Sequence, residues 1–155
     1  MRPVRVHNFG IYFITAATWE RRTLFTSEAW ARLFLKTLYE YRVSGKYLLH
    51  EFVLMPDHFH VIITPVDIPL ERAVQFIKGG FSFRAGRELA SGCEIWQKGF
   101  TDHRIREAAD YGRCRDYIFM NPVRARLCTE PGQYPFSSAH SGWVLDDVPQ
   151  RLKAA

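Results

Sequence analysis

The fold is decided by residues 47–64, which read YLLHEFVLMPDHFHVIIT. The segments Tyr47 to Met55 and His58 to Thr64 are rich in aromatic and aliphatic residues, and both are typical of buried strands. Met55-Pro56-Asp57 is typical of a turn, because proline lacks a backbone donor and aspartate bonds its neighbouring backbone. The stretch therefore predicts a hairpin whose second strand begins at His58.

A strand and a helix are predicted before this hairpin. Phe9 to Ala17 is rich in aromatic and β-branched residues, which favours a strand. Thr26 or Ser27 can cap a helix that ends at Ser44-Gly45. The apolar residues of this helix follow helical spacing, at Trp30, Leu33, Phe34, Leu38 and Tyr41.

A second helix and a last strand are predicted after the hairpin. Pro69 suits the first position of the helix. Its apolar stripe is formed by Leu70, Ala73, Val74, Ile77 and Phe81. Gly79-Gly80 is expected to weaken and bend this helix, at a cost of about 1 kcal/mol per glycine. Residues 95–105 are expected to supply the last strand.

A further helix is predicted over residues 106–120. It is expected to end near Asn121, because Pro122 disfavours helical geometry in the residue before it. The tail from Thr129 is rich in proline and predicts short helices or irregular structure. The element order is β-α-β-β-α-β with one more helix. This predicts an α+β fold of the ferredoxin-like split βαβ type, an antiparallel sheet with two helices on one face plus an additional helix.

Composition and charge restrict the class of protein. The chain has 155 residues, of which 47% are hydrophobic and 24% charged, so it can form a core. Three widely spaced cysteines are not a disulfide framework, and no apolar run reaches the roughly 18 residues of a membrane helix. We therefore expect a cytoplasmic protein with no membrane partner. The net charge of +5 favours an anionic partner such as nucleic acid, and residues 104–126 carry six arginines against three acidic residues.

His58-Phe59-His60 is the sharpest chemical feature. Residues two apart on a strand face the same side, so both imidazoles are predicted to lie side by side while Phe59 enters the core. Two imidazoles can bind one divalent cation if a third ligand completes the site. The alternative is a pair of ordinary surface or hydrogen-bonded histidines.

Tyr117 and Asn121 are predicted to share one helix face, because they are four residues apart. Arg113 and Arg124 are expected near that face, and their charges would favour the phenolate that a tyrosine nucleophile requires. Asn121 can offer an amide oxygen to the cation held by the histidines. The alternative is that Tyr117 packs with its hydroxyl at the surface. The opposite helix face is expected to be core, with Tyr111, Cys114 and Ile118.

Four motifs resemble one family. They are LMPDHFHVI at 54–62, IWQKGF at 95–100, YIFMNPVRA at 117–125 and YPFSS at 134–138. In this order they resemble the single-tyrosine HUH transposases, in particular the REP-associated tyrosine transposases of bacteria. The resemblance runs from about Phe9 to Trp143, and implies one HUH-type transposase domain over residues 1–143 followed by a C-terminal tail, 144–155.

The resemblance implies a role for each site residue. His58, His60 and Asn121 would bind Mg²⁺ or Mn²⁺, and Tyr117 would attack a phosphodiester in single-stranded or hairpin DNA. The products would be a 5′-phosphotyrosine link and a free 3′-hydroxyl, which permit strand transfer. Such proteins work as monomers or homodimers. The expected contacts to the DNA backbone are Arg104, Arg106, Arg113, Arg124, Lys78 and Arg84.

Three positions need separate interpretation. Asp57 stands where many relatives are expected to have asparagine, and it would tune the metal site, contact a base-reading loop or cap the turn. Phe136 stands where tryptophan is usual, which we interpret as packing. His103 is expected to contact DNA or solvent rather than to take part in catalysis. A catalytically silent DNA- or RNA-binding module and a phosphoesterase for small nucleotides are the alternative functions, but the phosphoesterase explains neither the Tyr117–Asn121 spacing nor the arginines.

Overall fold

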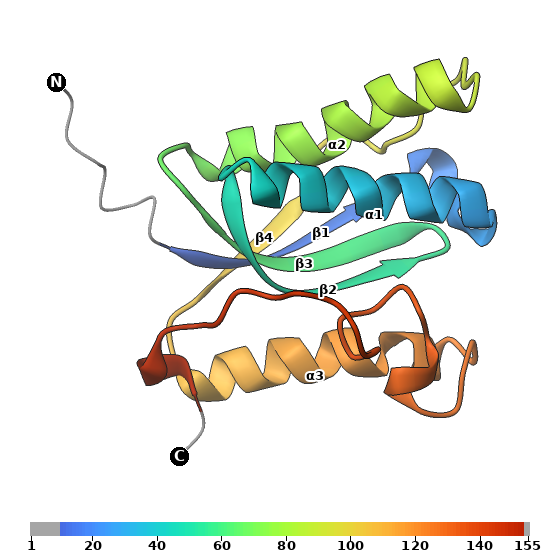
Figure 1. Ribbon diagram of the computed structural model, residues 1–155. Coiled ribbons are helices and arrows are strands. Elements are labelled where there is room, and N and C mark those ends of the chain that lie inside the picture. Colours follow the sequence, from blue (N-terminus) through green and yellow to red (C-terminus); the bar gives the residue numbers. More distant parts are fainter. Residues whose placement is uncertain (1–9, 154–155) are drawn as a thin grey trace, which may run out of the picture.

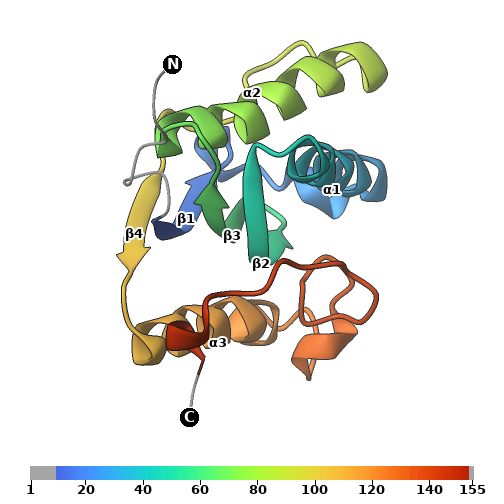
Figure 2. The same cartoon turned by 60° about the vertical axis from the view of Figure 1, so that its left-hand side comes forward.

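The computed structural model describes residues 10–153. Its four strands form one antiparallel sheet in the order β2-β3-β1-β4. The strands are β1 (Ile11–Ala17), β2 (Tyr47–Met55), β3 (His58–Pro65) and β4 (Thr101–Ile105), and the helices are α1 (Glu28–Val43), α2 (Leu70–Glu88) and α3 (Ala108–Arg124). Helices α1 and α2 cover one face of the sheet, and α3 lies on the other (Figures 1 and 2). The predicted split βαβ arrangement with an additional helix is confirmed.

The β2–β3 hairpin sits at one side of the sheet, with β3 buried between β2 and β1. Alternate residues of β3 enter different layers. Phe59, Val61 and Ile63 pack in the cluster under α1 and α2, whereas Ile62 packs in the cluster under α3. Because strand residues alternate between faces, His58 and His60 lie on the same side as Ile62, toward α3. The hairpin register therefore decides which layer receives the two imidazoles.

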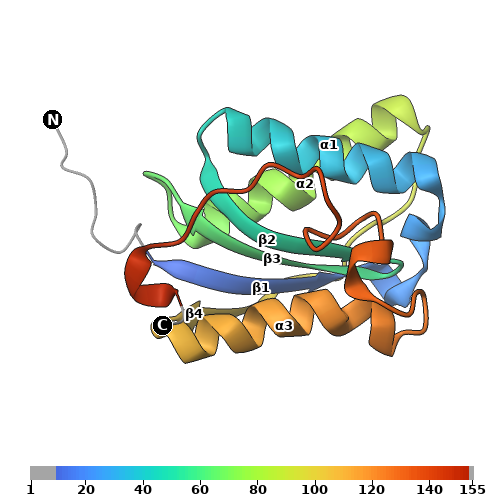
Figure 3. The ribbon, with the colours of Figure 1, turned by 60° about the horizontal axis from the view of Figure 1, so that its bottom comes forward.

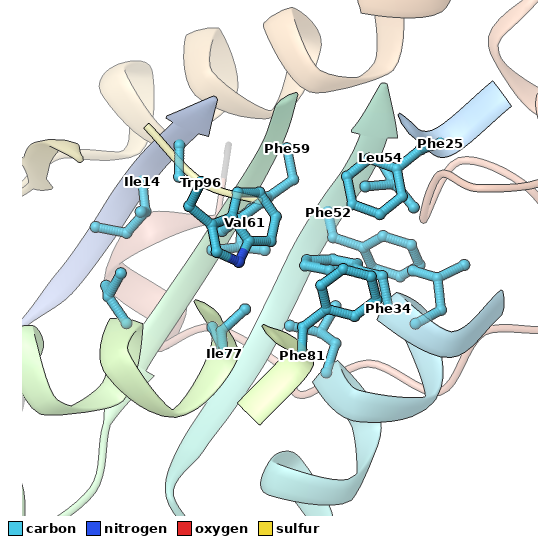
Figure 4. Close-up of a cluster of buried hydrophobic side chains, with 14 of the residues drawn as sticks. Ile14, Phe25, Phe34, Phe52, Leu54, Phe59, Val61, Ile77, Phe81 and Trp96 are labelled. Carbon is cyan, nitrogen blue, oxygen red and sulfur yellow. The ribbon is translucent and has the colours of Figure 1, made fainter. Parts of the chain in front are cut away.

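The core between the sheet and the first two helices is largely aromatic (Figure 4). The Phe34 ring of α1 lies 4.9 Å from the Phe59 ring and 5.6 Å from the Phe81 ring, measured between centroids. Trp96 packs 5.4 Å from Phe59, and its indole N–H donates to the Lys78 carbonyl at 2.9 Å. These contacts hold α1, α2 and β3 together.

Helix α2 is continuous through Gly79-Gly80. A Cβ on Gly80 would lie 2.6 Å from the Tyr41 ring, so glycine allows that ring to pack against α2. The guanidinium of Arg84 also lies over the Tyr41 ring, at 5.0 Å. One of the two glycines expected to weaken the helix thus leaves room for the Tyr41 ring between α1 and α2.

Three predicted boundaries differ from the structure. The last strand begins at Thr101, because Trp96 instead forms an isolated bridge with Thr18 and turns into the core. Helix α3 runs through Pro122 to Arg124, since the proline falls in the last turn, where the Ala125 N–H still donates to the Asn121 carbonyl. Pro69 precedes α2 as its cap rather than occupying the first helical position. Phe9, the predicted start of the first strand, lies outside the described residues.

The layer below the sheet combines α3 with the C-terminal segment, which follows the β2 side of the sheet (Figure 3). Tyr111, Cys114 and Ile118 are buried there, as predicted for the inner face of the helix. The Asp146 carboxylate accepts two hydrogen bonds from Arg42, at 2.8 and 2.9 Å, and one from the Leu49 N–H at 2.8 Å. The tail forms short 3₁₀ helices at Pro131–Gln133 and Gln150–Leu152, as predicted.

Within residues 10–153, none of the helices combines the length and apolar character needed to cross a membrane.

Candidate active site

Strand β3 and the turn before it position the two histidines. The His58 and His60 ring centroids lie 4.9 Å apart. Nδ1 of His58 is 2.7 Å from the Asp57 carboxylate, and Nδ1 of His60 is 2.7 Å from the Thr15 hydroxyl. Thr15 is the residue opposite His60 in the β1–β3 register. The Nδ1 atom of each imidazole therefore has a hydrogen-bond partner.

Helix α3 brings Tyr117 and Asn121 to the same place. The Tyr117 ring lies 5.2 Å from the His60 ring, and the Asn121 amide nitrogen lies 3.3 Å from His60 Nε2. Asn121 is buried, whereas 46% of Tyr117 is exposed. The four predicted residues thus meet, although 56 or more positions separate the histidines from the helix residues in the sequence.

The two histidines, Tyr117 and Asn121 all line one cavity of about 370 Å³. Its lining residues are Thr15, Arg21, His58, His60, Tyr117, Asn121, Arg124 and Ala125. The Arg124 guanidinium lies 4.8 Å from the Tyr117 ring centroid and donates to the Tyr117 carbonyl at 3.1 Å. The cavity therefore combines a tyrosine hydroxyl, two imidazoles and two guanidinium groups, which suit an anionic phosphate substrate.

Burial decides the state of His60. Burial is the largest cause that lowers the pKa of His60, and electrostatic interactions with His58, Arg21 and Arg124 lower it further, to about 3. The imidazole is consequently neutral near pH 7 and keeps the lone pair that a metal ligand needs. At Asp57, burial raises the carboxyl pKa, but the hydrogen bond from His58 and the charge of Arg21 outweigh it, so the net pKa is lowered. Asp57 is therefore an anion beside the histidine pair.

The donor set fits a divalent cation. Two imidazoles and an amide oxygen are accepted ligands, and rotation of the Asn121 amide would direct its oxygen toward His60. A second group of possible metal ligands lies nearby, and two of its members line a cavity together with His60 and Tyr117. It consists of His103, Asp110 and Cys114, whose ligand atoms lie within 4.8 Å of one another. There the Asp110 carboxylate contacts His103 at 2.6 Å and Arg113 at 3.6 Å.

The six basic residues expected to bind DNA do not share one surface. Arg113 and Arg124 lie beside Tyr117, each lining a cavity that Tyr117 also lines. Arg104 and Arg106 are exposed, on β4 and just before α3. The other two belong to α2, in the opposite layer (Figure 2).

The contacts of these two α2 residues are internal. The Lys78 ammonium donates to the carbonyls of Gln97 and Gly99, at 3.0 and 2.7 Å. Arg84 pairs with Glu40 at 2.6 Å. Both side chains therefore connect neighbouring elements of the fold, away from Tyr117.

Sequence reasoning missed Thr15 and Arg21 as members of the site. Thr15 could have been found, because the predicted split βαβ order places β1 beside β3, where Thr15 lies opposite His60. Arg21 could not, since it ends a short 3₁₀ turn after β1, Trp19–Arg21, and has a left-handed backbone conformation, with φ of 54°.

Comparisons with known proteins identify the family of the chain. A family model described as "Transposase IS200 like" matches residues 7–121. The chain is 27% identical over 139 residues to a REP-associated tyrosine transposase of Escherichia coli K12, covering 83% of this chain and 80% of the relative. Among solved structures, a REP-associated tyrosine transposase bound to a REP hairpin superposes with a TM-score of 0.74 at 26% identity, covering 90% of this chain and 84% of the other. The chain belongs to the family of IS200-like transposases.

Proposed function

We propose that this protein nicks and rejoins single-stranded DNA by forming a covalent bond between Tyr117 and a 5′-phosphate. The observation that carries the proposal is the position of Tyr117, whose ring lies 5.2 Å from the His60 imidazole of the same chain. A nucleophile needs its electrophile held nearby and in line. The adjacent imidazoles and guanidinium groups are suited to hold a phosphodiester next to the tyrosine.

The proposed reaction exchanges one phosphodiester for another. The Tyr117 oxygen attacks phosphorus and loses its proton, while the bond from phosphorus to the 3′-oxygen breaks and that oxygen gains a proton. The 5′-phosphate stays on the tyrosine. Attack by the 3′-hydroxyl of another strand reverses these steps and releases Tyr117, which completes strand transfer without ATP.

We assign the metal to His58, His60 and Asn121. A bound Mg²⁺ or Mn²⁺ would neutralise phosphate charge and orient the phosphate for in-line attack. Arg124, above the Tyr117 ring, would contact the same phosphate through its guanidinium. Because the tyrosine and the histidines that meet belong to one chain, we propose that a monomer holds a complete site.

We propose hairpin-containing DNA as the substrate. The similar REP-associated transposase was solved bound to a REP hairpin, and this chain covers 84% of it. Arg113 and the exposed Arg104 and Arg106 extend the basic surface beyond the cavity. They would contact backbone phosphates flanking the scissile bond.

The test is incubation with a single-stranded hairpin oligonucleotide and Mn²⁺, followed by denaturing electrophoresis. A protein band shifted by covalent DNA is expected, and EDTA or Tyr117→Phe should abolish it. Tyr111→Phe is the control on the inner face of the same helix and should retain the adduct. Tight hairpin binding with no adduct under any divalent metal would instead favour a catalytically silent binding module.

A further inference from the structure

The Asp57 carboxylate bridges two side chains from different elements. Its Oδ1 lies 2.7 Å from Nδ1 of His58, and its Oδ2 accepts from Nε of Arg21 at 3.0 Å. The Asp57 side chain is 24% exposed and that of His58 15%, so this contact is largely shielded from solvent, whereas the Arg21 side chain is 60% exposed. Each carboxylate oxygen thus has its own partner.

A carboxylate fixes the proton of the imidazole that it contacts. An ionised carboxylate only accepts hydrogen bonds, so Nδ1 of His58 must be the donor. In the neutral ring the lone pair is then on Nε2. This is the arrangement in which histidine ligands are held by carboxylates in metal sites.

The segment carrying Arg21 is held against this turn. The buried Thr18 donates through its N–H to the Asp57 carbonyl at 2.9 Å. Its hydroxyl lies 2.7 Å from the Arg22 carbonyl and 3.1 Å from the Asp57 carbonyl. The end of β1 and the start of β3 are therefore joined at the residue that contacts His58.

The backbone at Arg21 is unusual. Glu20 and Arg21 both have φ of 54°, in the left-handed region that non-glycine residues rarely adopt. Core packing does not require it, because both residues are exposed. Such conformations cost of order 1 kcal/mol or more and cluster at functional sites. At Arg21, this backbone conformation occurs together with the hydrogen bond from its side chain to Asp57.

We infer that Arg21 and Asp57 are a positioning pair, which holds the His58 imidazole with its Nε2 lone pair free for the cavity. The inference rests on the proposed role of His58 as a metal ligand and adds two residues to the site. Asp57 sets the tautomer and the orientation of the ring. Arg21 holds the carboxylate in place through its hydrogen bond to Oδ2.

The tautomer is measured directly by two-bond ¹H–¹⁵N correlation NMR of the imidazoles in metal-free protein at pH 8.5. In the wild type, His58 should carry its proton on Nδ1. In Asp57→Ala the proton should move substantially to Nε2, and Mn²⁺ affinity should fall about ten- to one-hundredfold, as for other lost partners of histidine ligands. Asp57→Asn keeps an acceptor oxygen and should largely preserve the tautomer, with a smaller loss of affinity.

The variants Arg21→Gln and Glu20→Gln distinguish the effect of losing the Arg21–Asp57 ion pair from the effect of changing one surface charge. Both change one exposed charged residue with a left-handed backbone, but of the two only Arg21 contacts Asp57. Arg21→Gln should weaken Mn²⁺ binding several-fold, whereas Glu20→Gln should leave it unchanged. A wild-type His58 protonated on Nε2, or an unchanged tautomer in Asp57→Ala, would overturn the inference. The NMR measurement uses neither metal nor DNA, so its result stands whether or not the covalent adduct forms.

Discussion

The side-chain amide nitrogen of Asn121 lies 3.3 Å from Nε2 of His60. This contact connects helix α3 to strand β3, on the side of the sheet opposite α1 and α2 (Figure 3). Tyr117 precedes Asn121 by one helical turn, so the helix that presents the amide also presents the phenol. The position of the proposed nucleophile therefore depends on how α3 packs against the histidine strand.

Asn121→Ala should lower Mn²⁺ affinity about tenfold or more, because it removes one of three proposed ligands. Asn121→Asp keeps an oxygen at that position and should retain binding. Isothermal titration with Mn²⁺ measures both, and Met120→Ala, an exposed neighbour on the same helix, is the control. Equal affinity in Asn121→Ala and the wild type would exclude Asn121 as a ligand.

Arg124→Gln should weaken hairpin DNA binding. The slope of log K against log salt concentration should become shallower by about 0.9, the value for one lost phosphate contact. The reason is the guanidinium position, 4.8 Å from the Tyr117 ring in the proposed site. Arg84→Gln removes the same charge from the opposite layer and should leave the salt slope unchanged. Fluorescence anisotropy at several salt concentrations compares them. An equal loss in both variants would mean that net charge, rather than this surface, governs binding.

Phe34→Ala should lower the free energy of unfolding by about 3–5 kcal/mol, as expected for a large cavity in an aromatic core. The Phe34 ring packs against Phe25, Phe59, Phe81 and Trp96. Phe83→Ala is the matched control, since Phe83 is 63% exposed and should change stability by less than about 1 kcal/mol. Urea denaturation gives both values. Similar small losses of stability in the two variants would contradict the packing of Phe34 in the aromatic core.

Asp146→Asn should destabilise the protein at pH 7 by roughly 1–3 kcal/mol, because the charged acceptor of Arg42 is lost. At Asp146, burial raises the pKa, but the hydrogen bonds from Arg42 and the Leu49 N–H outweigh it and lower the pKa below its ordinary 3.8. A lowered pKa in the folded state means that this contribution is present above about pH 4 and is lost as the pH falls below it.

The unfolding curves of Asp146→Asn and the wild type should therefore converge in acid. Chemical denaturation between pH 2.5 and 7 follows this convergence, with the exposed Asp67→Asn as control. A constant difference at every pH would show that the carboxylate charge plays no part.

The local parts of the fold were predictable from the sequence. The strands β2 and β3, with the turn at Pro56-Asp57, follow from a continuous apolar pattern interrupted by two turn residues. Their pairing fixes the facing of His58 and His60. The helical spacing of Tyr117 and Asn121 likewise required no tertiary information.

Features that depend on contacts between distant segments were not predictable. Trp96 leaves the expected strand because the aromatic core accepts its ring. Pro122 stays in α3, where the N–H groups of Ala125 and Leu127 still donate to the carbonyls of Asn121 and Pro122. The directions in which the Lys78 and Arg84 side chains point depend on how α2 packs. The distribution of charges along the sequence does not reveal this packing. Arg21 reaches Asp57 across 36 positions through a rare backbone conformation.

The most direct test of the account is to identify the residue that carries DNA in the covalent adduct. The adduct formed with hairpin DNA and Mn²⁺ is digested with protease and nuclease, and the modified peptide is sequenced by mass spectrometry. We expect a nucleotide phosphate on Tyr117 and none on Tyr111 or Tyr134. A nucleotide on any other residue, or an adduct that persists in Tyr117→Phe, would contradict it.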